Sequence, residues 1–184
     1  MSKASLALAI CFLCVLAPAP CGAFDVDVVS AGIRARVSGN DVLGKEQPEA
    51  FREYDVWAAF RLPWQAYGSS NWGVATRLLT SAGYLEAAGS SGLVVSVLPL
   101  VAFGTEDGRF TVDLGAGLAV LSRTKFGQAD FGGTVQGALT AGVSIPLYQR
   151  LGVGYRYMHY SDWGAYGPNT IGADLHTVEL IYRF

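Results

Sequence analysis

The sequence has few cysteines and no excess of charge of either sign, and each shortage excludes a class of function. The three cysteines, Cys11, Cys14 and Cys21, lie within the first 21 residues of a 184-residue chain. If this segment is cleaved off, the rest of the chain has no disulfide, no thiol nucleophile and no thiolate to bind a metal. The chain has 13 Lys and Arg against 15 Asp and Glu, a balance that argues against nucleic acid as a partner.

The first 23 residues have the three parts of a secretory signal peptide. Lys3 supplies the positive start, residues 6–16 form an apolar segment, and residues 21–23 (Cys-Gly-Ala) form a cleavage site of small residues. The apolar segment is too short to cross a bilayer as a helix. We therefore predict a signal peptide over residues 1–23 and one domain over residues 24–184.

No apolar run after residue 23 approaches the roughly 20 residues that a membrane-spanning helix needs. Apolar residues instead alternate with polar ones in short segments, which is the pattern of β-strands with two different faces. Turn sequences rich in Gly, Ser, Asn and Asp separate most of these segments. The predicted strands cover residues 26–38, 51–62, 71–84, 92–103, 109–122, 130–147, 150–161 and 174–184.

The two faces of the predicted strands differ in chemistry. In the fifth strand, Val112 and Leu114 share an apolar face, whereas Thr111 and Asp113 share a polar one. The polar faces carry Gly, Ser, Thr and charges of both signs, which can pair inside a narrow barrel but would be costly to bury alone. The charged residues expected there are Arg34, Arg36, Arg61, Arg77, Arg109, Arg156, Arg183, Glu53, Asp55, Asp113 and Glu179.

An apolar outer face around a polar interior is typical of a barrel that crosses a membrane. We predict an all-β fold, a closed eight-stranded antiparallel transmembrane β-barrel whose interior is filled by side chains. Closure is required in lipid because an open edge would leave backbone groups unpaired. Aromatic residues near strand ends are expected to form girdles at the membrane surfaces, namely Tyr54, Trp64, Trp72, Tyr84, Tyr148, Tyr160, Trp163 and Tyr166.

One group of residues has the composition of a hydrolytic site. By alternation, His159 and Ser161 lie on the outward face of the seventh strand near the rim, and Asp174 and His176 lie on the outward face of the eighth. Glu179 has the opposite parity and points inward. Acyl transfer needs a serine to attack, a histidine to take its proton and a carboxylate to orient the imidazole. We expect Ser161, His159 and Asp174 to fill these roles.

Each of these residues also has a simpler interpretation. A histidine at a membrane rim is commonly an interfacial polar residue, and a serine or aspartate at a strand end commonly belongs to a turn. The sequence has no cluster with metal-ligand spacing, no Gly-rich phosphate loop and no Gly-x-Ser-x-Gly elbow. No metal and no organic cofactor is therefore expected.

The segment YRYMHYSDWGAYGPNTIGADLHTVELIYRF, residues 155–184, resembles the C-terminal signature of the lipid A 3-O-deacylases, the PagL-type outer-membrane esterases. In that signature, Arg-Tyr-x-His-x-Ser-Asn is followed by Pro-Asn, a Gly, an acidic or amide residue and a final strand. The segment GAGLAVLS, residues 115–122, resembles the family's Gly-rich strand. The resemblance implies an eight-stranded barrel in the outer membrane of Gram-negative bacteria, which hydrolyses the 3-position ester of lipid A and releases a 3-hydroxy fatty acid.

By motif position, the resemblance assigns the family's serine to Ser161, its histidine to His159 and its acid to Asp174. Asp174 stands where the family usually has Glu. Asp162 stands where the family commonly has Asn, whose amide is implied to help form the oxyanion hole. An ionised carboxylate has no proton to donate, so Asp162 is only a tentative oxyanion residue. The backbone N–H of Gly164 could donate the hydrogen bond to the oxyanion instead.

Other functions stay open from the sequence alone. The first is a non-catalytic small barrel with a structural, adhesion or partner-binding role, the second is a small channel, and the third is a phospholipase that differs only in its substrate. The partners expected for the esterase are lipid A or lipopolysaccharide and the lipids of the outer membrane. The sequence does not specify whether the protein is a monomer or a dimer.

Overall fold

The computed structural model describes residues 27–38, 43 and 47–184. The predicted signal peptide, residues 1–23, lies outside the described residues, so the boundary after residue 23 stays a prediction. No helix in the described part of the chain is long and apolar enough to cross a bilayer.

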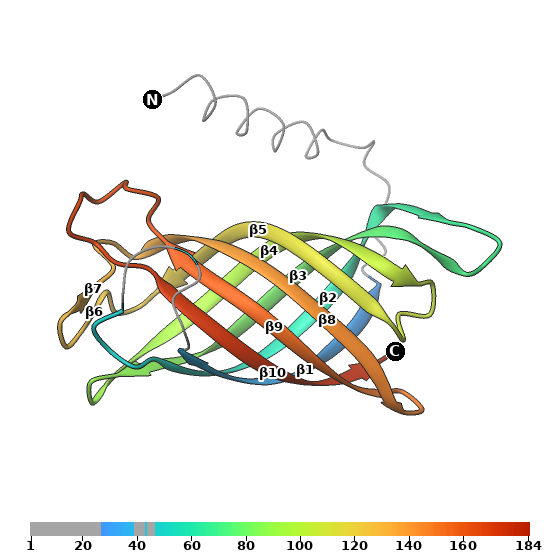
Figure 1. Cartoon of the computed structure of the whole chain (residues 1–184), viewed down its shortest axis with the longest axis horizontal. Helices are drawn as coiled ribbons and strands as arrows, with labels where there is room; N and C mark the ends of the chain where they lie inside the picture. The colour runs from blue at the N-terminus through green and yellow to red at the C-terminus, as the bar shows by residue number, and fades with distance from the viewer. Residues whose placement is uncertain (1–26, 39–42, 44–46) are drawn as a thin grey trace, which may run out of the picture.

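The described chain forms a closed antiparallel barrel of eight strands, as predicted (Figure 1). The order around the barrel is β1-β10-β9-β8-β5-β4-β3-β2, and β1 closes the barrel by pairing with β10. Each barrel strand otherwise pairs with the barrel strand next to it along the chain. The strands are β1 (Val28–Ser38), β2 (Arg52–Tyr67), β3 (Trp72–Ala87), β4 (Ser90–Thr105), β5 (Thr111–Leu121), β8 (Val135–Tyr148), β9 (Leu151–Ser161) and β10 (Ala173–Arg183).

A small hairpin between β5 and β8 is not part of the barrel sheet and was not predicted. It pairs β6 (Lys125–Phe126) with β7 (Ala129–Asp130). The prediction that the sixth barrel strand begins at residue 130 is wrong, because β8 begins only at Val135. Gly132 has a φ of 76°, a backbone conformation that favours glycine, so the chain turns here before it joins the barrel.

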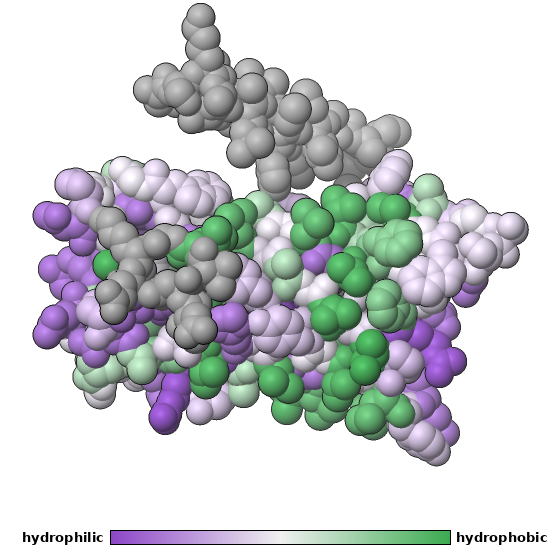
Figure 2. Space-filling view, viewed as in Figure 1, coloured by the Kyte–Doolittle hydropathy of each residue, from purple (hydrophilic) through white to green (hydrophobic). Residues whose placement is uncertain are grey.

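The outward face of the barrel is apolar, as the alternation predicted. Figure 2 shows apolar residues gathered over the middle of the barrel wall and hydrophilic residues toward its two ends. This is the distribution of a barrel whose middle is surrounded by hydrocarbon. The exposed outward side chains of β5, β8 and β10 include Val112, Leu114, Leu118, Val120, Val135, Val143, Ile145, Val178, Leu180 and Tyr182.

The interior contains buried ion pairs, as predicted. The placement of Arg61 and Arg109 in the interior is wrong, because both are exposed near the ends of the barrel. Arg34 Nε donates a hydrogen bond to Asp55 at 2.7 Å, and Arg36 Nη1 donates one to Glu53 at 2.6 Å. Further buried pairs join Arg36 to Asp55, Arg34 to Glu179, Arg156 to Asp113 and Arg156 to Glu179. Because breaking a buried pair leaves an uncompensated charge, this network fixes which residues face the interior.

Aromatic rings fill the interior beyond the ion pairs. Phe51, Phe126 and Phe131 are buried and pack edge to face, with ring centroids 5.6 to 6.1 Å apart. Phe126 and Phe131 come from the β6–β7 region, so this connection folds over the end of the barrel. Paired charges and packed rings thus occupy much of the described interior, and such an interior does not favour the channel hypothesis.

The predicted girdle residues are exposed, with the exception of Tyr160. Tyr160 is fully buried, and its hydroxyl accepts a hydrogen bond from Arg36 at 2.8 Å and donates one to Glu53 at 3.2 Å. The prediction for Tyr160 is therefore wrong. Its even number places it on the same face of β9 as Arg156, and that face lines the interior.

The two ends of the barrel differ. The start of β1 and the end of β10 lie at one end, together with the connections at residues 68–71, 106–110 and 149–150 (Figure 1). The opposite end carries the longer connections after β1, β5 and β9. We call it the loop end, and the predicted site lies there.

Candidate active site

The direction of the side chains on β9 decides where the site lies. Arg156 and Tyr160 have contacts inside the barrel, whereas Tyr155 is 46% exposed on the outside. Odd-numbered residues of β9 therefore point outward. His159 and Ser161 follow this alternation at the loop end, where β9 ends at Ser161.

His159 and Asp174 are direct partners across the β9–β10 pair. Nδ1 of His159 is in contact with Oδ1 of Asp174, and both residues are buried although they lie on the outward side of the wall. The register explains why a short side chain is sufficient, since residues opposite each other on paired strands have their Cβ atoms only about 4.5–5.5 Å apart. The aspartate thus reaches the imidazole in spite of the methylene that it lacks relative to glutamate.

The carboxylate of Asp174 has two further hydrogen-bond donors that the sequence did not suggest. The Tyr157 hydroxyl donates to Oδ1 at 2.7 Å, and the backbone N–H of Leu43 donates to Oδ2 at 2.8 Å. Gln47 also donates to the backbone carbonyl of Asp174 at 3.4 Å. A carboxylate that is almost wholly removed from water needs such donors, because burial of an unpaired charge is costly.

A glycine lies beside the imidazole. A Cβ atom at Gly172 would lie 3.2 Å from Cε1 of His159 and 2.5 Å from the carbonyl oxygen of Tyr160. The second distance is too short for a real contact, so only glycine fits the close approach of the chain before β10. A side chain at position 172 would therefore also press against the imidazole of His159.

Ser161 is half-buried at the end of β9. Its Oγ accepts a hydrogen bond from the backbone N–H of Trp163 at 3.1 Å. Within the described residues, its side chain is bonded to Trp163 and not to His159. Catalytic hydrogen bonds are often absent or long until substrate binds, so this arrangement is compatible with a serine that turns toward the imidazole.

The connection after β9 is held together by Asp162. Its carboxylate accepts hydrogen bonds from the N–H of Gly164 at 2.9 Å, the N–H of Tyr166 at 2.9 Å and the hydroxyl of Thr170 at 2.8 Å. Burial acts to raise the pKa of Asp162, but these hydrogen bonds outweigh it and lower the pKa below its usual value. The two tentative oxyanion residues, Asp162 and Gly164, are therefore bonded to each other, and the N–H of Gly164 is already engaged.

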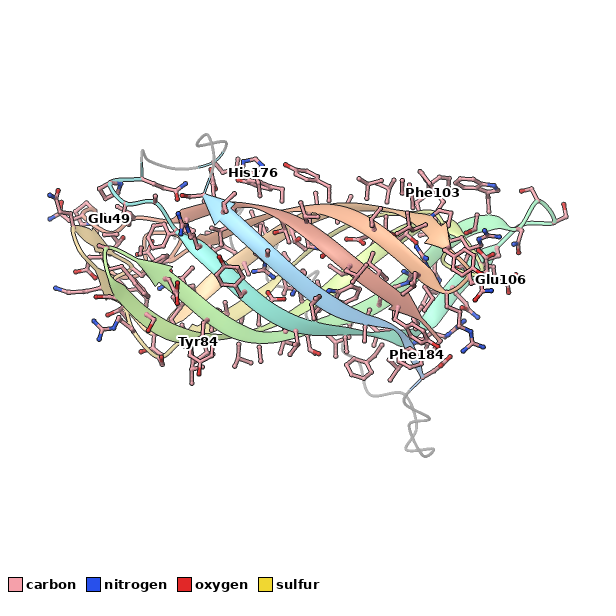
Figure 3. The ribbon with its side chains drawn as sticks, turned by 90° about the horizontal axis from the view of Figure 1, so that it is seen from below. Glu49, Tyr84, Phe103, Glu106, His176 and Phe184 are labelled. Atoms are coloured by element: carbon pink, nitrogen blue, oxygen red, sulfur yellow. The ribbon has the colours of Figure 1, made fainter. Side chains whose placement is uncertain are left out.

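The second histidine lies apart from the predicted triad. His176 points away from the barrel axis (Figure 3), and its Nδ1 is 2.5 Å from the Tyr155 hydroxyl. The ring of Tyr157 lies between this pair and Asp174, with its centroid 5.7 Å from that of His176. No group of three or more metal-ligating side chains was found in the part of the chain that the structure describes.

The structure thus brings His159 and Asp174 into contact and places Ser161 two residues further along the same face. Tyr157 and Leu43 were not singled out from the sequence. The parity of Tyr157 was a usable signal, because it lies on the face of His159 and diagonally across from Asp174. The contact of Leu43 had no such signal, since it depends on how the connection after β1 lies against β10.

Comparisons with known proteins point to one family. The family model Lipid A 3-O-deacylase (PagL) matches residues 52–183. The lipid A deacylase PagL of Bordetella bronchiseptica (strain ATCC BAA-588 / NCTC 13252 / RB50) is 29% identical over 126 residues, which cover 66% of this chain and 70% of that protein. The crystal structure of the outer membrane enzyme PagL superposes with a TM-score of 0.63 at 18% identity, over 83% of this chain and 99% of that chain. At this identity, the superposition shows the shared fold.

The matched region contains seven of the eight barrel strands whole and the segment with His159, Ser161 and Asp174. The family resemblance noted from the sequence is confirmed: the chain belongs to the lipid A 3-O-deacylase (PagL) family and is a β-barrel of the outer membrane.

Proposed function

We propose that this protein is a serine-type esterase that removes the acyl chain linked to the 3-position of lipid A. Ser161 is the nucleophile, His159 is the general base and acid, and Asp174 orients the imidazole. The observation that carries the proposal is the contact between Nδ1 of His159 and Oδ1 of Asp174, on the outward face that also carries Ser161. A buried histidine–carboxylate pair next to a serine is the arrangement that acyl transfer requires.

The first half-reaction follows from these positions. The Nδ1–H of His159 is hydrogen-bonded to Asp174 and stays on the imidazole. The unprotonated Nε2 accepts the proton of Ser161 as Oγ forms a bond to the ester carbonyl carbon. The resulting intermediate collapses by breaking the bond to the sugar oxygen, which takes the proton from Nε2. The acyl chain is then an ester of Ser161. Asp174 offsets the positive charge that His159 carries between the two proton transfers.

The second half-reaction uses water. Nε2 of His159 takes a proton from a water molecule, whose oxygen attacks the acyl-enzyme carbonyl carbon. Collapse breaks the bond to Oγ, which recovers the proton from His159, and the 3-hydroxy fatty acid leaves. The overall reaction consumes one water molecule and needs no metal or organic cofactor.

The developing oxyanion requires a donor other than those suggested by the sequence. We assign this role to the backbone N–H of Trp163, which lies 3.1 Å from Oγ of Ser161. When Oγ binds the carbonyl carbon, the carbonyl oxygen is attached to that same carbon and lies within reach of this N–H. Asp162 and Gly164 then act by holding the connection in which Trp163 lies. One such donor is worth on the order of 10²–10³ in rate.

The location of the site suits a substrate that stays in the membrane. In outer-membrane barrels, short turns lie on the periplasmic side and long connections on the outer side. The loop end would then face outward, which places Ser161 near the head groups of the outer leaflet. An ester of lipid A can approach the outward face of β9 and β10 without leaving the bilayer.

The proposal is tested with protein refolded in detergent and supplied with purified lipid A. We expect the wild type to release a 3-hydroxy fatty acid, measured by mass spectrometry, and Ser161→Ala to release none above background. Ser91→Ala is the matched control, because Ser91 is exposed on β4 away from the site. No release by the wild type would favour a non-catalytic barrel, and release of phospholipid acyl chains instead would indicate a phospholipase.

A further inference from the structure

Asp174 faces outward but is almost wholly buried, and the hydrogen bonds to its carboxylate support a further inference. Its Oδ1 is shared by two partners, Nδ1 of His159 and the hydroxyl of Tyr157, which donates at 2.7 Å. Its Oδ2 is held by the N–H of Leu43. Both carboxylate oxygens are therefore fixed, and the orientation of the acid depends on more than the histidine.

The register explains how Tyr157 reaches the acid. Tyr157 lies two residues before His159 on the same face of β9, and it pairs directly with His176. Asp174 pairs with His159, so Tyr157 and Asp174 are diagonal neighbours across the two strands. Long aromatic side chains span such diagonal positions, at which Cα atoms are about 7–8 Å apart.

The neighbours of Tyr157 limit how its ring can move. The ring centroids of Tyr157 and His176 are 5.7 Å apart, and the ring planes are inclined at 57°. His176 is itself hydrogen-bonded to the Tyr155 hydroxyl. The phenol is thus directed at the acid by packing on one side and by its hydrogen bond on the other. Tyr155, on the same strand and face, is bonded to His176 and not to Asp174, so the two tyrosines have different partners.

We propose that Tyr157 is a positioning residue that holds Asp174 in the orientation in which Oδ1 faces His159. This inference rests on the proposed serine-esterase function. An aspartate has a short side chain whose carboxylate can turn, and only one orientation presents Oδ1 to Nδ1. Without the phenol hydroxyl, Oδ1 loses one of these two partners, so the carboxylate is held less firmly and the alignment of the imidazole is weakened.

The test compares two matched variants, Tyr157→Phe and Tyr155→Phe, each of which removes one hydroxyl from the same face of β9. We expect Tyr157→Phe to lower kcat by about tenfold or more, as for the loss of a hydrogen bond to a charged group, with KM unchanged. Tyr155→Phe is expected to keep kcat within about twofold of wild type, since it leaves the acid untouched. Migration of folded and heated samples on gels checks that both variants form barrels.

A double-mutant cycle separates positioning from a general structural role. Added to Asp174→Asn, the change Tyr157→Phe is expected to have an effect of less than about twofold, because the charged acceptor that it served is gone. A wild-type kcat in Tyr157→Phe, an equal loss in Tyr155→Phe, or a rise in KM alone would overturn the inference. Full activity in Ser161→Ala would instead overturn the proposed function, so the two failures are distinct.

Discussion

The indole of Trp163 occupies the space that a side chain at Gly137 would fill. Gly137 on β8 pairs directly with Ser161 on β9, and a Cβ atom at Gly137 would lie only 2.4 Å from Cζ2 of Trp163. Because β8 has no side chain at position 137, the indole of Trp163 can lie against the barrel wall next to Ser161. Because the N–H of Trp163 is also bonded to Ser161, the packing of this indole and the position of the proposed oxyanion donor are linked.

Gly137→Leu is therefore expected to lower lipid A hydrolysis by at least about tenfold, as displacement of one oxyanion donor costs on the order of 10²–10³ when it is complete. The barrel itself should still form, since position 137 faces outward. Release of 3-hydroxy fatty acid is the measurement. Ala82→Leu is the control, because it places the same leucine side chain at an exposed position on β3, away from the site. Equal activity in the two variants would contradict the role of Trp163.

Changes at Asp174 test the acid. Asp174→Asn removes the charge that offsets the imidazolium, and we expect kcat to fall by roughly 10²–10⁴, as for other serine hydrolases whose acid becomes an amide. Asp174→Glu restores the family's usual residue but adds a methylene at a buried site whose carboxylate oxygens already have partners. We expect this variant to be less active than wild type in the same assay. Higher activity in Asp174→Glu would contradict the expectation that the hydrogen bonds at this site fit an aspartate better than a glutamate.

The strand pattern of this protein could be predicted from sequence because each barrel strand has one face in lipid and one in a polar interior. That alternation alone predicts His159, Ser161 and Asp174 on one outer surface. Tyr160 shows that residue type alone is not enough to predict which side of the barrel wall a side chain faces. Its aromatic ring near a strand end suggests a girdle, but its even number places it on the interior face of β9, where it is bonded to Arg36.

The connections could not be predicted in the same way. Their conformation depends on hydrogen bonds from a few side chains, such as those that Asp162 accepts from Gly164 and Tyr166, and these leave no periodic pattern. The β6–β7 hairpin was missed for the same reason. The oxyanion role also depends on this region. This is why the sequence suggested Gly164, whereas our proposal names Trp163 on the basis of its hydrogen bond to Ser161.

The interior ion pairs are predicted to be essential for stability. Arg36 is fully buried and bonded to Glu53 and Asp55. Arg36→Met leaves both carboxylates without this partner, and we expect a loss of about 3–5 kcal/mol in the free energy of unfolding. Urea titration of the protein in lipid vesicles measures it. Arg61→Met is the control, because Arg61 forms a solvent-exposed pair with Asp27 and should change stability far less. Equal losses would show that burial of the network contributes little.

The hydrogen bonds to Asp162 predict a pH dependence of the connection after β9. The pKa of Asp162 is lower in the folded connection than in an unfolded one. The stabilisation is therefore fully present above the unfolded value of about 4, and is lost as the pH falls through the lower folded value. The amide resonance of Gly164 in NMR spectra should report this loss below pH 4 in the wild type and show no such step in Asp162→Asn. A wild-type transition above about pH 5, where a free carboxyl is already ionised, would contradict the assignment.

The identity of the nucleophile is tested most directly by covalent labelling. A serine-directed phosphonate is added to the refolded wild type, to His159→Asn and to Ser161→Ala, and the labelled peptide is identified by mass spectrometry. The proposed mechanism predicts a single label on Ser161 in the wild type, at least about 10²-fold slower labelling in His159→Asn, and none in Ser161→Ala. A wild type that hydrolyses lipid A while Ser161 stays unlabelled, or a label on another residue whose removal abolishes activity, would contradict it.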